Sequence, residues 1–177
     1  MLGSVALPAG ADQRRARDAD DTKGPLDIAW IKHGHRTNTR GVRQLVHTVR
    51  LYKRWPARRL RHRGYVHLFF QLRGHPGNPE ERTLWIVYEK GKLRARMYNA
   101  LGDPPKFLAN VGLWRPDGRT VKVTFRKSLL RRRPFDHYKW SALSYIEGGH
   151  PLCGRSNGCG DFAPDLKRGK RYLRHDI

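Results

Sequence analysis

Hydrophobic and polar positions alternate through most of the chain, and a β-hairpin over residues 82–98 shows this best. Its two arms are rich in β-branched, aromatic and aliphatic side chains and flank Lys90-Gly91, a pair that suits a two-residue turn. On one face Trp85 is expected to lie opposite Arg96. The other face should be apolar, formed by Leu84, Ile86, Tyr88, Leu93, Ala95 and Met97.

The same alternation recurs in shorter segments that are separated by turn residues. Strands are expected within residues 26–32, 42–51, 65–72, 107–114, 119–126 and 137–146. In the first of these, Leu26, Ile28 and Trp30 should point inward. Regular short strands with little helix predict an all-β fold, an antiparallel two-sheet sandwich that is jelly-roll-like and has about 7–9 strands.

The 177 residues suffice for a single domain with a hydrophobic core. Residues 1–11 are apolar and end in Ala9-Gly10-Ala11, which is typical of the remnant of a secretion signal. Residues 12–24 should form a flexible polar arm, and residues 25–177 a β-sandwich domain with a basic C-terminal tail. We therefore expect an extracellular protein. No apolar run approaches the roughly 20 residues that span a bilayer.

The strongly positive charge of the chain limits the kinds of molecule that it is expected to bind. The chain has 37 basic and 15 acidic residues, a formal net charge of +22. Between Ile28 and Asn78 twelve residues are basic and none is acidic. Such a sector would attract phosphate or sulfate groups, although its charges need not share one face. One alternative is that these charges only form a solvated surface. The other is that they bind an anionic partner, which could be an extracellular polyanion, a nucleic acid or a membrane surface.

Aromatic and cationic side chains meet on the outward face of the hairpin. An exposed Trp85 beside arginine could stack on a sugar ring or a base. The alternative is that a second layer covers this face and makes Trp85 part of the core. The predicted ligand-binding residues are Trp85, Arg94, Arg96, Tyr98, Arg50, Arg58 and Arg59.

Aspartates gather near both ends of the domain. Asp18 and Asp27 belong to the early group. The ends of a sandwich often run close together, so oxygen ligands from both groups could hold a structural calcium ion. Salt bridges to arginine are the alternative. The expected ligands are Asp20, Asp21, Asp161 and Asp165.

Histidines offer a second metal hypothesis. His33 and His35 lie two residues apart in a predicted strand and share a side, a spacing that can hold zinc or copper with a third histidine such as His47. The inward assignment of Trp30 places the pair outward, however, and His47 inward. His47 is therefore predicted to be a buried, hydrogen-bonded core residue.

Cys153 and Cys159 flank a short loop of glycine, serine, arginine and asparagine. In an exported protein they should form a disulfide, which would contribute about 2–3 kcal/mol. The sequence has no H-E-x-x-H and no phosphate-binding glycine loop. Asp161 with Asp165 leaves open a carboxylate-dependent hydrolase.

Several stretches resemble a group of small secreted actinobacterial proteins of unknown function. They are Asp21–Ile28 (DTKGPLDI), His33–His35 (HGH), Leu45–Tyr52 (LVHTVRLY), Trp55–Leu60, Leu113–Phe125 (LWRPDGRTVKVTF), Tyr138–Ala142 (YKWSA) and the cysteine loop with Asp161–Asp165 (DFAPD). This pattern is similar to carbohydrate-binding and DOMON-like sandwich modules. The resemblance implies a fold and no activity.

The expected function is therefore binding rather than catalysis. The predicted ligand is an extracellular glycan or anionic polymer, bound through a basic and aromatic face. A nucleic-acid-binding protein that uses residues 28–78 is the first alternative, and a secreted carboxylate-dependent hydrolase is the second. Structural calcium is the one cofactor considered, and the sequence does not indicate an oligomeric state.

Overall fold

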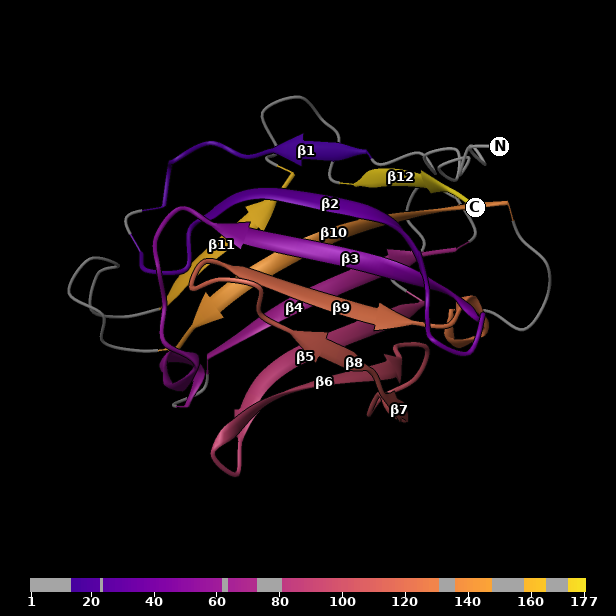
Figure 1. Ribbon diagram of the computed structural model, residues 1–177. Coiled ribbons are helices and arrows are strands. Elements are labelled where there is room, and N and C mark those ends of the chain that lie inside the picture. Colours follow the sequence, from indigo (N-terminus) through magenta and orange to yellow (C-terminus); the bar gives the residue numbers. More distant parts are fainter. Residues whose placement is uncertain are drawn as a thin grey trace, which may run out of the picture.

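Two antiparallel β-sheets pack face to face in the computed structural model of the chain (Figure 1). The structure describes residues 14–22, 24–61, 64–72, 81–130, 136–147, 158–164 and 172–177. Within these ranges the helical elements are two short 3-10 turns, η1 (Ala57–Leu60) and η2 (Lys127–Leu129). The predicted all-β, two-sheet antiparallel sandwich is confirmed.

The smaller sheet has five strands. In spatial order they are β1 (Arg15–Arg17), β2 (Ile28–Thr37), β3 (Arg43–Leu51), β9 (Thr120–Phe125) and β8 (Gly112–Trp114). Each pairs antiparallel with its neighbour. Side chains alternate between the two faces of a strand, so every second residue of this sheet faces the core and the rest face outward.

The larger sheet has seven strands. In spatial order they are β11 (Cys159–Ala163), β10 (His137–Ile146), β4 (Gly64–Gln71), β5 (Arg82–Glu89), β6 (Lys92–Asn99) and β7 (Lys106–Asn110), and β12 (Leu173–Asp176) also pairs with β10. Strands β11 and β12 pair with different lengths of β10. In Figure 1 the smaller sheet lies in front of the larger one.

The β5–β6 hairpin has the predicted register. Leu84 lies opposite Met97, and Trp85 opposite Arg96. Lys90 and Gly91 both have positive φ, 48° and 81°, as a tight hairpin turn requires. The predicted apolar face points into the core, where Leu84 and Ile86 are fully buried.

The first predicted strand faces as expected at Leu26 and Ile28, which are buried, but not at Trp30. The pairing of β2 with β3 shifts between Ile28 and Trp30, which makes Ala29 an extra, bulged residue. After the bulge Ile31 is buried and Trp30 is half-exposed on the outer face. The prediction that Trp30 points inward is therefore wrong, because a strict two-residue period cannot include an extra residue.

Three strands lie where none was expected. β1 falls within the segment predicted to be a flexible polar arm, β11 follows the cysteine loop, and β12 lies in the predicted basic tail. All three are short, between three and five residues, so they show little alternation. Their side chains nevertheless reach the interior: His175 of β12 is completely buried.

Candidate functional site

The outer face of the smaller sheet carries cationic and aromatic side chains in rows across the strands. In one row the registers join Lys32, Thr48, Lys122 and Trp114, on β2, β3, β9 and β8. Arg15 of β1 extends this row beyond Lys32. The row therefore places three cations and one tryptophan along a line that crosses the whole sheet.

The next row is made of small residues: Gly34, Val46, Thr124 and Gly112. Gly112 is required by close approach, since a Cβ atom there would lie 2.4 Å from the Oγ1 atom of Thr124. Beyond this row lies Arg36, which bonds the side-chain oxygen of Gln44 at 3.1 Å. Low side chains between two taller rows leave a depression in the surface.

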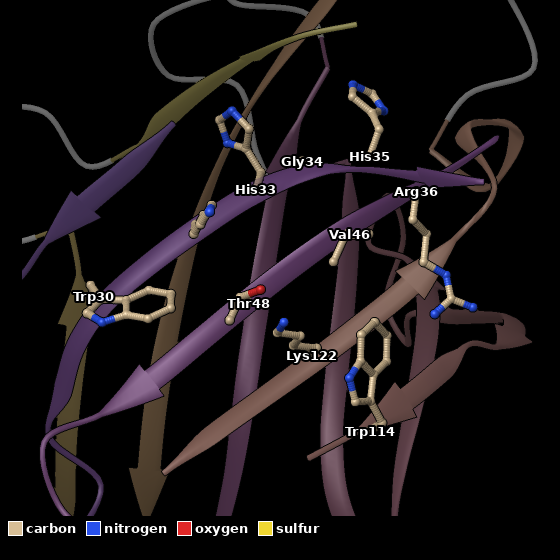
Figure 2. A pocket seen from close by; sticks show the side chains of 10 residues that line it. Trp30, His33, Gly34, His35, Arg36, Val46, Thr48, Trp114 and Lys122 are labelled. Atoms are coloured by element: carbon tan, nitrogen blue, oxygen red, sulfur yellow. The ribbon is translucent and has the colours of Figure 1, made fainter. Parts of the chain in front are cut away.

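This depression, the small-sheet hollow, measures about 290 Å³. Its lining includes Trp30, Lys32, Gly34, Arg36, Val46, Thr48, Trp114 and Lys122. Figure 2 shows Thr48 and Lys122 between the two tryptophans. Three strand spacings, about 14 Å, separate β2 from β8, and Trp30 lies two residues along β2 from the row that contains Trp114. The hollow is wider than a single sugar ring or base.

Each of the two tryptophan rings has the charged group of an arginine of the same chain above it. The guanidinium of Arg15 lies 4.4 Å from the ring centre of Trp30, and that of Arg36 lies 5.1 Å from the ring centre of Trp114. The ammonium of Lys122 is 5.7 Å from the Trp114 ring. Such cation–π contacts hold the charged groups over the rings.

The cations of the hollow are not neutralised. Among the described residues no ion pair involves Lys32, Arg36 or Lys122. On the same sheet Asp117, in the turn before β9, is bound to Arg50 at 2.8 Å. Hydrogen bonds from the backbone of Arg119 and from Thr120 lower the pKa of Asp117 to about 2. This carboxylate is therefore already bound, by hydrogen bonds within the turn before β9 and by the ion pair with Arg50.

The predicted ligand-binding residues lie in three separate places. Trp85, Arg94, Arg96 and Tyr98 lie on the outer face of the larger sheet, and the last three line a second hollow with Phe107 and Asn110. Arg50 belongs to the smaller sheet, and Arg58 and Arg59 lie on η1. The chain does not bring the seven residues together.

Neighbours already occupy the hairpin face. Arg96 forms a two-pronged ion pair with Glu89. The half-buried Trp85 ring lies 4.5 Å from the His67 ring and 5.0 Å from the Tyr65 ring. Trp85 is thus part of an aromatic cluster on this sheet, and its arginine partner is charge-compensated.

Two of the predicted calcium ligands, Asp21 and Asp161, lie together. With Asp27 they form a group whose ligand atoms are all within 4.8 Å of one another. Asp20 lies close enough to contribute to the raised pKa of Asp27. Asp165 lies outside the described residues. Sequence reasoning put Asp27 in the early acidic group and did not select it as a ligand.

Because of the bulge, His33 and His35 point inward, so the expected outward placement is wrong. They join His47 and His175 between the sheets. The Tyr138 hydroxyl bonds His47 Nε2 at 2.7 Å and His175 Nδ1 at 2.5 Å. His175 Nε2 then meets His35 Nε2 at 3.1 Å. The prediction that His47 is a buried, hydrogen-bonded core residue is confirmed.

This buried chain favours uncharged imidazoles. Burial lowers the pKa of His175 to about 2, and the positive charge of neighbouring histidines and arginines acts in the same direction. Burial also lowers the pKa of His47 and, with help from Arg43 and Lys127, that of His35. Nearby cations disfavour a metal ion at His35 and His175 for the same electrostatic reason.

Cys159 is buried at the start of β11. Cys153 lies outside the described residues, so the disulfide remains a prediction. Among the described residues, no helix is long and apolar enough to cross a membrane.

Sequence reasoning did not identify the small-sheet hollow. The available signal was the run of Trp30, Lys32, Gly34 and Arg36 at every second position, which a bulge at Ala29 would turn outward. Trp114 with Lys122 could not be placed beside that run without the strand order. Comparison with family models, with curated proteins and with solved structures gave no match.

Proposed function

We propose that the protein binds an anionic polymer, in particular an acidic extracellular polysaccharide, in the small-sheet hollow. The observation that carries this proposal is the set of cations without acidic partners, Lys32, Arg36 and Lys122, around a floor of small residues. An anion entering the hollow would meet these charges with little competition from carboxylates of the chain.

The position of the guanidinium groups favours an anionic ligand over a neutral sugar. Arg15 and Arg36 already lie over the tryptophan rings, so the rings hold cations in place. Holding them before binding reduces the entropy that a ligand must remove. A carboxylate, sulfate or phosphate group gains from this arrangement, and an uncharged pyranose does not.

The width of the hollow favours a polymer. The row from Arg15 to Trp114 crosses five strands, or four spacings, about 19 Å. One small anion could engage only part of such a row. A chain that carries a charge on successive units could contact Lys32 and Lys122 together.

The test measures binding of heparin and polygalacturonate to the whole chain, with dextran as the neutral polymer, by titration calorimetry from about 50 to 200 mM salt. Both polyanions should bind, with affinity falling as salt rises, and dextran should not. The variant Lys32→Ala/Lys122→Ala should weaken binding at least tenfold and lower the slope of log affinity against log salt by about one per lysine.

Lys92→Ala/Lys106→Ala is the matched control, because it removes two exposed lysines from β6 and β7 of the other sheet. It should change affinity by less than the hollow variant. Equal losses in the two variants would mean that attraction is spread over the surface, and the hollow would not be the site. Preferential binding of a thymidine oligonucleotide would contradict the polysaccharide assignment in favour of nucleic acid.

An extracellular location is part of the same proposal. It is supported by the apolar residues 1–11 and by the cysteine pair expected to be oxidised. Titration of the unfolded, unreduced protein with a thiol reagent should find no free thiol. Two free thiols would contradict the disulfide and weaken the case for export.

A further inference from the structure

A group of carboxylates converges where the connection between β1 and β2 meets the larger sheet. Asp21 and Asp27 come from that connection, and Asp161 comes from β11. One carboxylate oxygen from each lies within 4.8 Å of the others. Oxygens that bind one calcium ion at about 2.3–2.6 Å are separated by up to about 5 Å, so the group has the size of such a site.

Asp27 is the central and most unusual member. Its side chain is 1 % exposed, and neither carboxylate oxygen has a hydrogen-bond partner in the described part of the chain. A buried ionised carboxylate without a partner is strongly disfavoured unless a cation or a proton compensates it. The groups that face it are other aspartates, among them Asp20 and Asp161.

The protein does not use its own cations here. Of 37 lysines and arginines, none within the described residues forms an ion pair with Asp20, Asp21 or Asp27. In a chain of net charge +22, carboxylates that served in salt bridges would be expected to lie beside arginine or lysine, and among the described residues these do not. It is the arrangement that a metal ion would stabilise.

Neighbouring groups are already arranged around this point. Asp161 Oδ2 accepts a hydrogen bond from the backbone N–H of Ile28 at 2.5 Å, which fixes this carboxylate beside the start of β2. The Tyr52 hydroxyl donates to the carbonyl of Asp18 at 2.7 Å. Burial and the negative charges of Asp20 and Asp27 raise the pKa of this tyrosine, as expected beside a concentration of acid groups.

We propose that Asp21, Asp27 and Asp161 bind a single calcium ion that joins the β1–β2 connection to β11. Carboxylate oxygens are the ligands that calcium takes, whereas zinc prefers nitrogen and sulfur. Magnesium binds oxygen at about 2.0–2.1 Å and demands a tighter octahedron. The ion links the two sheets beside the hydrogen bond from Ser144 Oγ to the carbonyl of Leu26.

The competing explanation is a proton shared between Asp27 and a neighbouring carboxylate. The two explanations differ in one measurable respect, since only a metal site responds to calcium. Thermal unfolding of the full chain, stripped with chelator, is compared with and without up to about 10 mM calcium, a range that covers extracellular calcium modules. A hundredfold excess of calcium over Kd should raise Tm by about 5–10 °C.

Asp21→Asn is the informative variant, because Asp21 is exposed and its amide should not disturb folding. It should weaken calcium binding at least tenfold in calorimetry. Asp27→Asn should abolish binding. Asp103→Asn, an exposed aspartate in the loop between β6 and β7 at the far edge of the sheet, should bind like the wild type.

Terbium luminescence, sensitised by the nearby Tyr52, gives an independent signal that calcium should displace. An unchanged Tm together with no heat and no terbium signal would overturn the proposal and leave the shared proton. Equal affinity for magnesium would overturn the choice of calcium. None of these outcomes depends on polyanion binding.

Discussion

Lowering the pH from 7 to 5 is expected to destabilise the fold, and His67 provides the cleanest test of the cause. This side chain lies on the outer face of β4, is 8 % exposed and packs against the rings of Phe69 and Trp85. Its Nε2 atom has no hydrogen-bond partner among the described residues. Burial lowers the pKa of His67 from 6.5 to about 3.

The sign follows from proton uptake. Below pH 6.5 the unfolded chain binds a proton at His67 and the folded chain does not, so acid favours the unfolded state. Each pH unit in this range costs about 1.36 kcal/mol, and the change from pH 7 to pH 5 costs about 2 kcal/mol for this histidine. The stability is fully present above pH 6.5 and falls until about pH 3.

The assay is urea unfolding at pH 8, 7, 6 and 5, with the free energy of unfolding of each protein referred to its own value at pH 8. His67→Phe should lose less stability between pH 7 and 5 than the wild type, by about 2 kcal/mol. Phe69→Leu is the matched control: it alters the same aromatic cluster, adds no titrating group and should keep the wild-type pH dependence. Equal acid sensitivity in wild type and His67→Phe would refute the reasoning.

The wild type should show more acid sensitivity than His67 alone explains. The pKa of His175 is lowered to about 2 and that of His47 well below its usual value, in both cases first by burial. Both act with the same sign as His67. His67 and His175 would together cost about 4 kcal/mol by pH 5, a large part of the stability of an ordinary domain, and His47 adds to this loss with the same sign.

Two further predictions concern packing. Tyr138→Phe should lower the free energy of unfolding at pH 8 by about 2–4 kcal/mol, because it leaves buried nitrogens of His47 and His175 without a partner; a loss below about 1 kcal/mol in urea would contradict the importance of this chain. Gly112→Ala should cost about 1–3 kcal/mol because its Cβ would meet the Thr124 hydroxyl. The double variant Gly112→Ala/Thr124→Ala should recover part of that loss, and no recovery would show that the strain lies elsewhere.

Local pattern was enough to predict the hairpin. Glycine at the turn and strict alternation in both arms determine which residues lie opposite each other, so Leu84 with Met97 and Trp85 with Arg96 follow without knowledge of the rest of the fold. The strands over residues 43–51, 120–125 and 137–146 followed from the same period.

Long-range features were less accessible. The strand order that brings Trp114 beside Lys122 and Lys32 depends on pairings between distant segments. The approach of Asp161 to Asp27 similarly joins residues from opposite ends of the domain. Sequence could suggest that early and late aspartates are neighbours, but only the packed sheets show that Asp27 is the buried one.

The bulge at Ala29 has a consequence for related sequences. Ile28 faces the core and Trp30 faces outward, so both keep their faces whether or not a residue stands between them. Ala29 has no partner in the β2–β3 pairing, and its carbonyl accepts a hydrogen bond from the backbone N–H of Asp18. Alignments of homologous chains are therefore expected to tolerate a one-residue gap at Ala29. A one-residue gap at Lys32 or Gly34 would turn the following side chains of β2 to the opposite face, so that residues of the hollow would point inward and buried histidines outward. Such a gap should be absent.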